Sequence, residues 1–85
     1  MTTKDFQLPF APETDIGFVS GFVLVAGRVN CKIEIYCNGM RFDAKSFLGL
    51  LYAGISPGAI FTLSAEGADE REALSRLSAY IDQYR

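Results

Sequence analysis

No histidine occurs among the 85 residues of this chain, and that absence removes several kinds of chemistry. Histidine is the most frequent general acid or base near neutral pH, a common metal ligand and the main physiological proton switch. We therefore expect no histidine-based catalysis, and the sequence predicts no metal site and no cofactor.

Cysteine is scarce as well, with only Cys31 and Cys37 present. The two lie in one predicted strand, so their Cα atoms would be about 20 Å apart, whereas a disulfide requires less than about 7 Å. Two thiols are too few for a zinc site. We expect both to be small buried hydrophobic residues of a protein in a reducing, cytoplasmic setting.

The sequence has no run of like charges, and its ten acidic and eight basic residues give a formal charge of −2. It therefore lacks the basic footprint of a protein that binds nucleic acid or an anionic membrane. The apolar stretch 16–26 is about half as long as a membrane span, and the first ten residues lack the apolar core of a signal peptide. We expect one cytoplasmic domain over residues 1–85, with no nucleic-acid binding and no membrane insertion.

Three segments alternate apolar and polar residues with the period of a β-strand, at 5–10, 31–37 and 59–66. In the first of them, Pro9 cannot donate to a sheet ladder and is expected to mark a strand end or an edge. The pair Asn38-Gly39 after the second segment is a strong hairpin signal and places a short return strand at 40–43. The positions predicted to face the core are Phe6, Leu8, Phe10, Cys31, Ile33, Ile35, Cys37, Phe61, Leu63 and Ala65, and those predicted to face outward in the last strand are Thr62, Ser64 and Glu66.

Cap residues mark the first two helices. Asp15 precedes a helical stripe of apolar residues that Gly27 is expected to end. Ser46 stands directly before FLGLLYAG, a compact apolar helix that Gly54 is expected to end.

A third helix is predicted from Asp69 to the end of the sequence. Asp69 with Glu72 three residues later resembles a capping box. One amphipathic stripe follows, made of Leu74, Leu77 and Ile81 with Ala73 and Tyr80 beside them. The resulting order of strand, helix, strand, strand, helix, strand, helix predicts an α+β open sandwich, with four antiparallel strands covered on one face by three helices.

Gly17 and Gly21 lie four apart on one face of the first predicted helix. Each interior glycine costs a helix up to about 1 kcal/mol relative to alanine. Two explanations remain open, namely the close approach of another group to the helix as part of a function, and tight packing or relaxation after a site was lost. We favour the second.

The stretches KSFLGLLYAGISPGA, from Lys45, and TLSAEGADEREAL, ending at Leu74, closely resemble the phosphocarrier protein HPr of the sugar phosphotransferase system. In that family a lysine-serine pair opens a short helix and a Gly-Ala-Asp-Glu turn opens the last helix. The resemblance extends over the whole chain without gaps. It implies the HPr-like βαββαβα fold, and a carrier or binding protein rather than an enzyme.

The N-terminal third departs from the family. Relatives carry a phosphorylated histidine at the start of the first helix, followed by an arginine and a proline. Aligned without gaps from Ser46, these three positions hold Asp15, Gly17 and Phe18. The resemblance therefore implies a family member that cannot carry phosphohistidine and has no catalytic residue at that position.

Asp15 has two possible roles. A carboxylate can form an acyl phosphate, but the neighbouring residues offer no metal ligand or lysine to manage the charge. As a helix cap, Asp is among the best residues and contributes about 1 kcal/mol. The cap is the favoured interpretation.

Ser46 also has two roles that are compatible with one another. In the Gram-positive branch of the family this serine is phosphorylated by a dedicated kinase, and the product binds a transcriptional regulator. Ser46 is equally a good cap for its short helix. The resemblance thus predicts a regulatory phosphorylation site, and the missing arginine at Gly17 weakens that match.

The short helix after Ser46 carries more apolar residues than one inward face can hold. We expect an exposed patch that binds a protein partner, and the alternatives are a homodimer contact or deeper burial of these residues. For Lys45 and Arg41 nearby, pairing with an acidic partner is one interpretation, and solvated surface charge is the favoured one. The residues predicted to form the patch are Phe47, Leu48, Leu51 and Tyr52, joined by Phe18 and Leu24 of the first helix.

From the sequence alone we therefore predict a regulatory or protein-binding relative of the phosphocarriers that acts in carbon metabolism. Its expected partners are a serine kinase or phosphorylase and a transcriptional regulator or phosphotransferase-system enzyme. It is expected to be a monomer or a weak homodimer. The alternatives are phosphotransfer through Asp15 and a binding module without phosphate chemistry.

Overall fold

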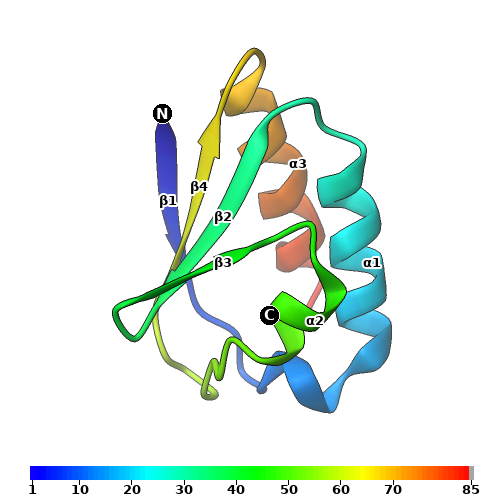
Figure 1. Ribbon diagram of the computed structural model, residues 1–85. Helices are drawn as coiled ribbons and strands as arrows, with labels where there is room; N and C mark the ends of the chain where they lie inside the picture. Colours follow the sequence, from blue (N-terminus) through cyan, green and yellow to red (C-terminus); the bar gives the residue numbers. More distant parts are fainter. Residues whose placement is uncertain (85) are drawn as a thin grey trace.

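The computed structural model describes residues 1–84 and shows an antiparallel sheet with helices on one face (Figure 1). The strand order in the sheet is β1-β4-β2-β3. The elements are β1 (Thr2–Phe6), a 3₁₀ helix η1 (Pro12–Thr14), α1 (Ile16–Gly27), β2 (Lys32–Cys37), β3 (Met40–Asp43), α2 (Phe47–Leu51), β4 (Phe61–Glu66) and α3 (Glu70–Asp82). The predicted α+β order is confirmed.

The first strand lies earlier in the chain than its alternation predicts. β1 pairs with β4 from Thr2↔Ala65 to Phe6↔Phe61, whereas Pro9 and Phe10 lie in a bend. Proline has no backbone N–H to give to a strand ladder, so the strand cannot continue through Pro9. The alternation at residues 5–10 reflects burial of Phe6 and Leu8 rather than a strand of that extent.

The β2–β3 hairpin turns on Asn38 and Gly39, as predicted. Both have positive φ angles, 54° and 75°, and Cys37 pairs directly with Met40. Two successive positive φ angles are the signature of a two-residue type I′ turn. Cys31 and Cys37 are free, and both are buried, as predicted for small hydrophobic residues.

Ser64 in β4 was predicted to be an outward-facing, solvent-exposed residue, but only 3% of its surface is exposed. β4 is a central strand, and Ser64 is paired with Thr3 on one side and Glu34 on the other. Neighbouring strands on both sides leave little solvent access to a small side chain on the open face.

The start of α3 also differs from the prediction. Asp69 has a left-handed backbone conformation, with φ of 61°, and its side chain makes no capping hydrogen bond. A capping box requires an extended cap residue whose side chain reaches the N3 amide, so the predicted pairing with Glu72 is wrong. The apolar stripe is confirmed, because Leu74, Leu77 and Ile81 are buried.

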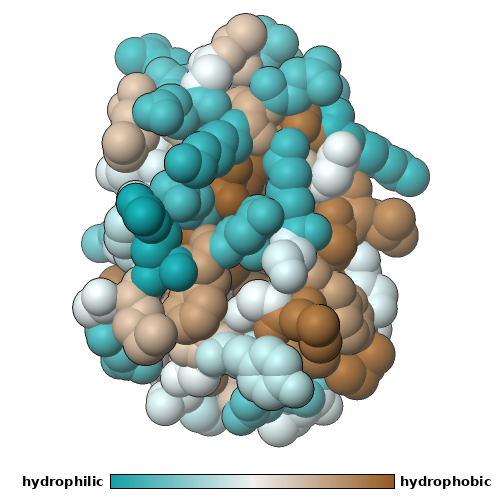
Figure 2. Space-filling view, in the orientation of Figure 1, coloured by the Kyte–Doolittle hydropathy of each residue, from teal (hydrophilic) through white to brown (hydrophobic). Residues whose placement is uncertain are grey.

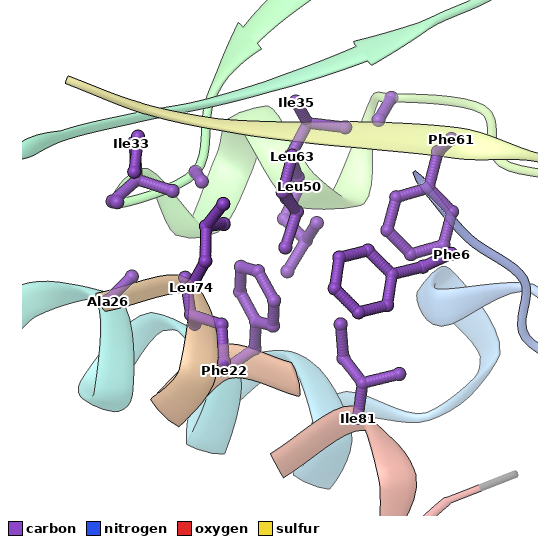
Figure 3. Close-up of a cluster of buried hydrophobic side chains, with 14 of the residues drawn as sticks. Phe6, Phe22, Ala26, Ile33, Ile35, Leu50, Phe61, Leu63, Leu74 and Ile81 are labelled. Carbon is purple, nitrogen blue, oxygen red and sulfur yellow. The ribbon is translucent and has the colours of Figure 1, made fainter. Parts of the chain in front are cut away.

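The core lies between the sheet and the three helices (Figure 3). Phe22 of α1 and Ile81 of α3 project toward Ile35 and Leu63 of the sheet. Within residues 1–84, no helix is both long and apolar enough to cross a membrane.

Candidate functional site

The entrance of α1 is capped by Asp15. Its Oδ1 accepts a hydrogen bond of 3.0 Å from the backbone N–H of Phe18. This bond satisfies one of the amides that a helix N-terminus leaves without an intrahelical partner. The predicted cap is therefore confirmed, and the carboxylate lies against the same amides that would otherwise favour an anion.

Phe18 is not part of an exposed patch, contrary to the sequence prediction. It is 1% exposed, and its ring lies 5.3 Å from that of Phe10, 5.5 Å from that of Tyr80 and 4.9 Å from that of Tyr84, measured between centroids. Phe18 lies on the inner face of α1, where it contacts Phe10 from the N-terminal part of the chain and Tyr80 and Tyr84 from the C-terminal part. The site at which the family's proline is expected is thus filled by an aromatic cluster.

Gly21 is explained by packing, which confirms the interpretation favoured from the sequence. A Cβ at Gly21 would overlap the Tyr80 side chain, whose hydroxyl donates a 2.7 Å hydrogen bond to the carbonyl oxygen of Phe18. Gly17 is exposed, and a Cβ there would lie 3.3 Å from Asp15 Oδ1. Only Gly21 is thus needed for contact between α1 and α3.

Ser46 caps α2 as predicted. Its Oγ accepts a 3.0 Å hydrogen bond from the backbone N–H of Gly49, and the residue is half-buried. A Cβ at Gly49 would lie 3.1 Å from the carbonyl oxygen of Asp43. The sequence did not indicate that position 49 requires a glycine. Because Gly49 has no side chain, the first turn of α2 can lie close to the end of β3.

The two cations near Ser46 both have partners within the chain. Lys45 Nζ donates a 2.8 Å hydrogen bond to the carbonyl oxygen of Val29, and Arg41 Nε lies 3.4 Å from Glu34 Oε2. Lys45 is half-buried, so its prediction as a solvated surface charge is wrong. Its ammonium connects the start of α2 to the segment that follows α1.

Large apolar side chains are exposed on α2 and on the adjoining side of α1. Leu48 is 60% exposed, Tyr52 76% and Leu24 61%, whereas Leu51 is half-buried. In the view of Figure 2, hydrophobic side chains gather at the lower right of the molecule, over α2 and α1. We call this surface the α1–α2 apolar surface; its exposed members are Ile16, Leu24, Phe47, Leu48 and Tyr52.

Ile16 was missed from the sequence. It lies eight residues before Leu24, a spacing that places both on the same side of α1. The signal was available, because the stretch 16–27 contains no charged residue at all. A helix that is apolar on every side needs cover on each of them.

The contacts of these residues are helix-capping bonds, other hydrogen bonds and apolar packing. Within residues 1–84, no group of three or more His, Cys, Asp or Glu side chains is placed to hold a metal ion. The Ser46 hydroxyl is a nucleophile at the start of α2 beside the exposed apolar side chains, and the exposed Ser20 of α1 carries another, one turn from both Ile16 and Leu24.

Residues 18–83 of the chain match the family described as "PTS HPr component phosphorylation site". The chain is 39% identical over 62 residues to the HPr-like protein Crh of Bacillus subtilis, a match that covers 73% of each protein. Among solved structures it is similar to HPr-C-His from Thermoanaerobacter tengcongensis, with a TM-score of 0.90, 27% identity and coverage of 99% of this chain and 94% of that one. It is also similar to B. subtilis Crh, described as a swapped, intertwined dimer, with a TM-score of 0.76, 34% identity and coverage of 84% and 82%.

The family match begins at Phe18, after Asp15 and Gly17. It therefore includes Ser46 and α2 but not the entrance of α1. Of the three positions at which the sequence departs from the motif, Asp15 and Gly17 precede the match and Phe18 is its first residue.

Proposed function

The chain belongs to the HPr family, and from that premise we propose that it is a regulatory, protein-binding member that acts through Ser46 and the α1–α2 apolar surface. It does not carry phosphate on histidine, because it contains no histidine. The observation that carries the proposal is that Ser46 lies inside the matched segment, at the start of a helix with large exposed apolar side chains.

Phosphorylation would act on Ser46 as follows. Oγ attacks the γ-phosphorus of ATP, its proton leaves to a base of the kinase, and ADP departs. The new phosphate adds about two negative charges beside the backbone amides of the first turn of α2, where negative charge is favourable. Its oxygens can also accept the Gly49 N–H that the Ser46 hydroxyl accepts now.

Recognition would combine this phosphate with apolar contact. Leu48 and Tyr52 project from the helix that the phosphate caps, so one partner surface can contact both. The cations of Lys45 and Arg41 are already engaged within the chain, so the partner rather than this protein supplies the positive charge for the phosphate. The proposed partners are a serine kinase or phosphorylase and a transcriptional regulator or phosphotransferase-system enzyme of the cytoplasm.

The test is incubation with the family's serine kinase and ATP, followed by intact-mass measurement. We expect the addition of one phosphate, abolished in Ser46→Ala and retained in Ser56→Ala, a matched control at an exposed serine of a turn. An unmodified wild-type protein, or a phosphate that survives in Ser46→Ala, would contradict the proposal.

A second candidate is a homodimer that buries the α1–α2 apolar surface. It is favoured by the exposure of Leu24, Leu48 and Tyr52 on adjoining helices. Light scattering should then give twice the chain mass, and Leu48→Lys should restore the monomer. Ile60→Lys is the matched control, since Ile60 is equally exposed, at 61%, but lies outside this surface. A monomer at every concentration would rule the candidate out.

Phosphotransfer through Asp15 remains the third candidate and has a separate test. Phosphoenolpyruvate and the first enzyme of the phosphotransferase system would have to produce a hydroxylamine-sensitive adduct that Asp15→Asn abolishes. We expect none, because the carboxylate serves as the helix cap.

A further inference from the structure

β1 forms one edge of the sheet, and its outer side has no strand beside it (Figure 1). Residues 2–5 pair with β4 on the inner side. Among residues 1–84, no backbone hydrogen bond from another segment reaches the outer side of these four residues. Such an edge presents a row of N–H and C=O groups to any extended segment of suitable side chains.

A groove of about 460 Å³ runs between this edge and α3. Its α3 wall is built from residues that recur every three or four positions along three turns of the helix. The side chains that matter to the argument are Lys4 from β1 and Arg71, Leu74, Ser78, Ala79 and Asp82 from α3.

The groove has the length of a short strand. Arg71 and Asp82 are eleven residues apart on α3, which corresponds to about 16 Å along the helix axis. Five residues of extended chain span about the same distance. An edge strand with a helix beside it is the arrangement by which sheets accept an added peptide strand, with main-chain bonds to the edge and side chains in the groove.

The charges of the groove select an acidic occupant. Lys4 Nζ donates a 2.9 Å hydrogen bond to Ser78 Oγ across the groove, and its ammonium lies 5.4 Å from the centre of the Phe6 ring. Within residues 1–84, neither Lys4 nor Arg71 forms a salt bridge. Asp82 is the one carboxylate lining the groove, and it stands at the end away from Arg71.

The same charges disfavour a second copy of this chain as the occupant. If two copies of β1 paired antiparallel about their centres, Lys4 would lie directly opposite Lys4 of the second copy. Like charges directly opposite across two strands are destabilising. A lysine on an edge strand is a known protection against such self-pairing.

We propose that the β1–α3 groove binds an extended acidic peptide segment of a partner protein, which adds a fifth strand to the sheet at the outer edge of β1. One carboxylate of the segment pairs with Lys4 and a second with Arg71, about two helical turns away, and an apolar side chain between them on the same face contacts Leu74. This site is separate from Ser46 and from the α1–α2 apolar surface, so it stands or falls independently of the function proposed above.

The test is titration of the ¹⁵N-labelled full chain with the acetylated, amidated pentapeptide Glu-Thr-Val-Thr-Glu, in which both glutamates and the valine lie on one face of the extended strand. We expect amide shifts confined to β1 and to the groove side of α3. Arg71→Glu should weaken binding about threefold to tenfold, as expected for the loss of one exposed charge contact and its replacement by repulsion. Arg76→Glu on the same helix is the matched control and should leave binding unchanged, because Arg76 does not line the groove.

Two further peptides separate the possible outcomes. The peptide Lys-Thr-Val-Thr-Lys and a Glu-Thr-Val-Thr-Glu peptide with N-methylated backbone amides should bind at least about threefold more weakly, because they lose the charge contacts or the strand hydrogen bonds. Equal binding of either one would overturn the proposal. So would an absence of shifts in β1, equal displacement by inorganic phosphate, or β1 shifts that depend only on protein concentration and therefore report self-pairing.

Discussion

The hydroxyl end of Tyr80 occupies the space that a side chain at Gly21 would require. From this position the hydroxyl donates its 2.7 Å hydrogen bond to the carbonyl oxygen of Phe18, one turn earlier on α1. A single α3 side chain thus fixes α3 against the first two turns of α1. The pair explains why a helix of such strongly apolar composition contains a glycine at its centre.

Gly21→Ala is therefore expected to destabilise the fold. The added methyl group must displace Tyr80, and overpacking of this kind costs about 1 to 3 kcal/mol. The gain in helix propensity recovers at most about 1 kcal/mol. Urea unfolding should show a lower midpoint for the variant.

Gly27→Ala is the matched control for this change. A Cβ at Gly27 meets nothing within 4 Å, so this variant should be as stable as the wild type or slightly more stable. In the double variant Gly21→Ala/Tyr80→Leu, the penalty of the alanine should be largely lost. Equal effects of Gly21→Ala in the presence and absence of Tyr80 would contradict the packing explanation.

Tyr80 is also expected to make stability fall at alkaline pH. Burial, followed by the neighbouring Tyr84 and the Asp15 carboxylate, raises the pKa of Tyr80 above its ordinary value, which is about 10. Above that pH the unfolded chain releases the phenolic proton while the folded chain retains it, so the free energy of unfolding decreases as pH rises.

The variant Tyr80→Phe distinguishes the titration of Tyr80 from that of the other tyrosines. The variant should lose about 0.5 to 1.5 kcal/mol at neutral pH with the hydrogen bond to Phe18. Between pH 10 and the folded-state pKa, its stability should decline less steeply than that of the wild type. Parallel pH profiles in denaturant unfolding would show that Tyr80 does not titrate in this way.

Asp15 is expected to matter for stability rather than for phosphate chemistry. Asp15→Ala removes the acceptor of the Phe18 N–H and should cost about 1 kcal/mol. Asp15→Asn keeps a capping oxygen and should cost much less. Thermal and urea unfolding of the two variants measure the difference, and equal losses would mean that the carboxylate acts through its charge instead.

Lys45 should contribute through its bond to Val29 rather than as a surface charge. Lys45→Met keeps the length of the side chain but leaves the Val29 carbonyl oxygen without this donor. Hydrogen bonds to charged groups contribute about 1.5 to 3 kcal/mol, and we expect the lower part of that range because the residue is only half-buried. Arg41→Met is the control at an exposed cation and should change stability by less than about 0.5 kcal/mol. A loss at Arg41 as large as that at Lys45 would argue against this distinction.

Local signals in the sequence predicted most of the fold. The alternation at 31–37 with Asn38-Gly39 predicted the central hairpin, since a period of two and a turn that requires positive φ are properties of short segments. Asp15 and Ser46 were recognised as caps for the same reason, because a cap bond extends over only three residues. The misplaced β1 and the failed Asp69 cap show the limit of these signals, since the alternation at 5–10 reflects buried side chains beyond the end of the strand, and the left-handed backbone of Asp69 leaves its side chain without a capping bond.

The candidate site was predicted less completely. Leu24, Leu48 and Tyr52 are exposed as expected, but Phe18 is buried and Lys45 is bonded within the chain. Helical periodicity indicates which residues share a face of α1, but not which faces the other elements cover. Phe18 is buried because Phe10, Tyr80 and Tyr84, from the two ends of the chain, meet around it.

The sequence by itself determined the order of the elements, the caps of α1 and α2, and the impossibility of phosphohistidine, because each depends on residue type or on near neighbours. Only the tertiary structure decided that Gly21 accommodates Tyr80, that Lys45 is bonded to Val29, and that Lys4 and Arg71 line one groove beside a free strand edge. These pairs are separated by long stretches of chain. Their contacts arise only when the helices pack on the sheet and bring distant side chains to the same place.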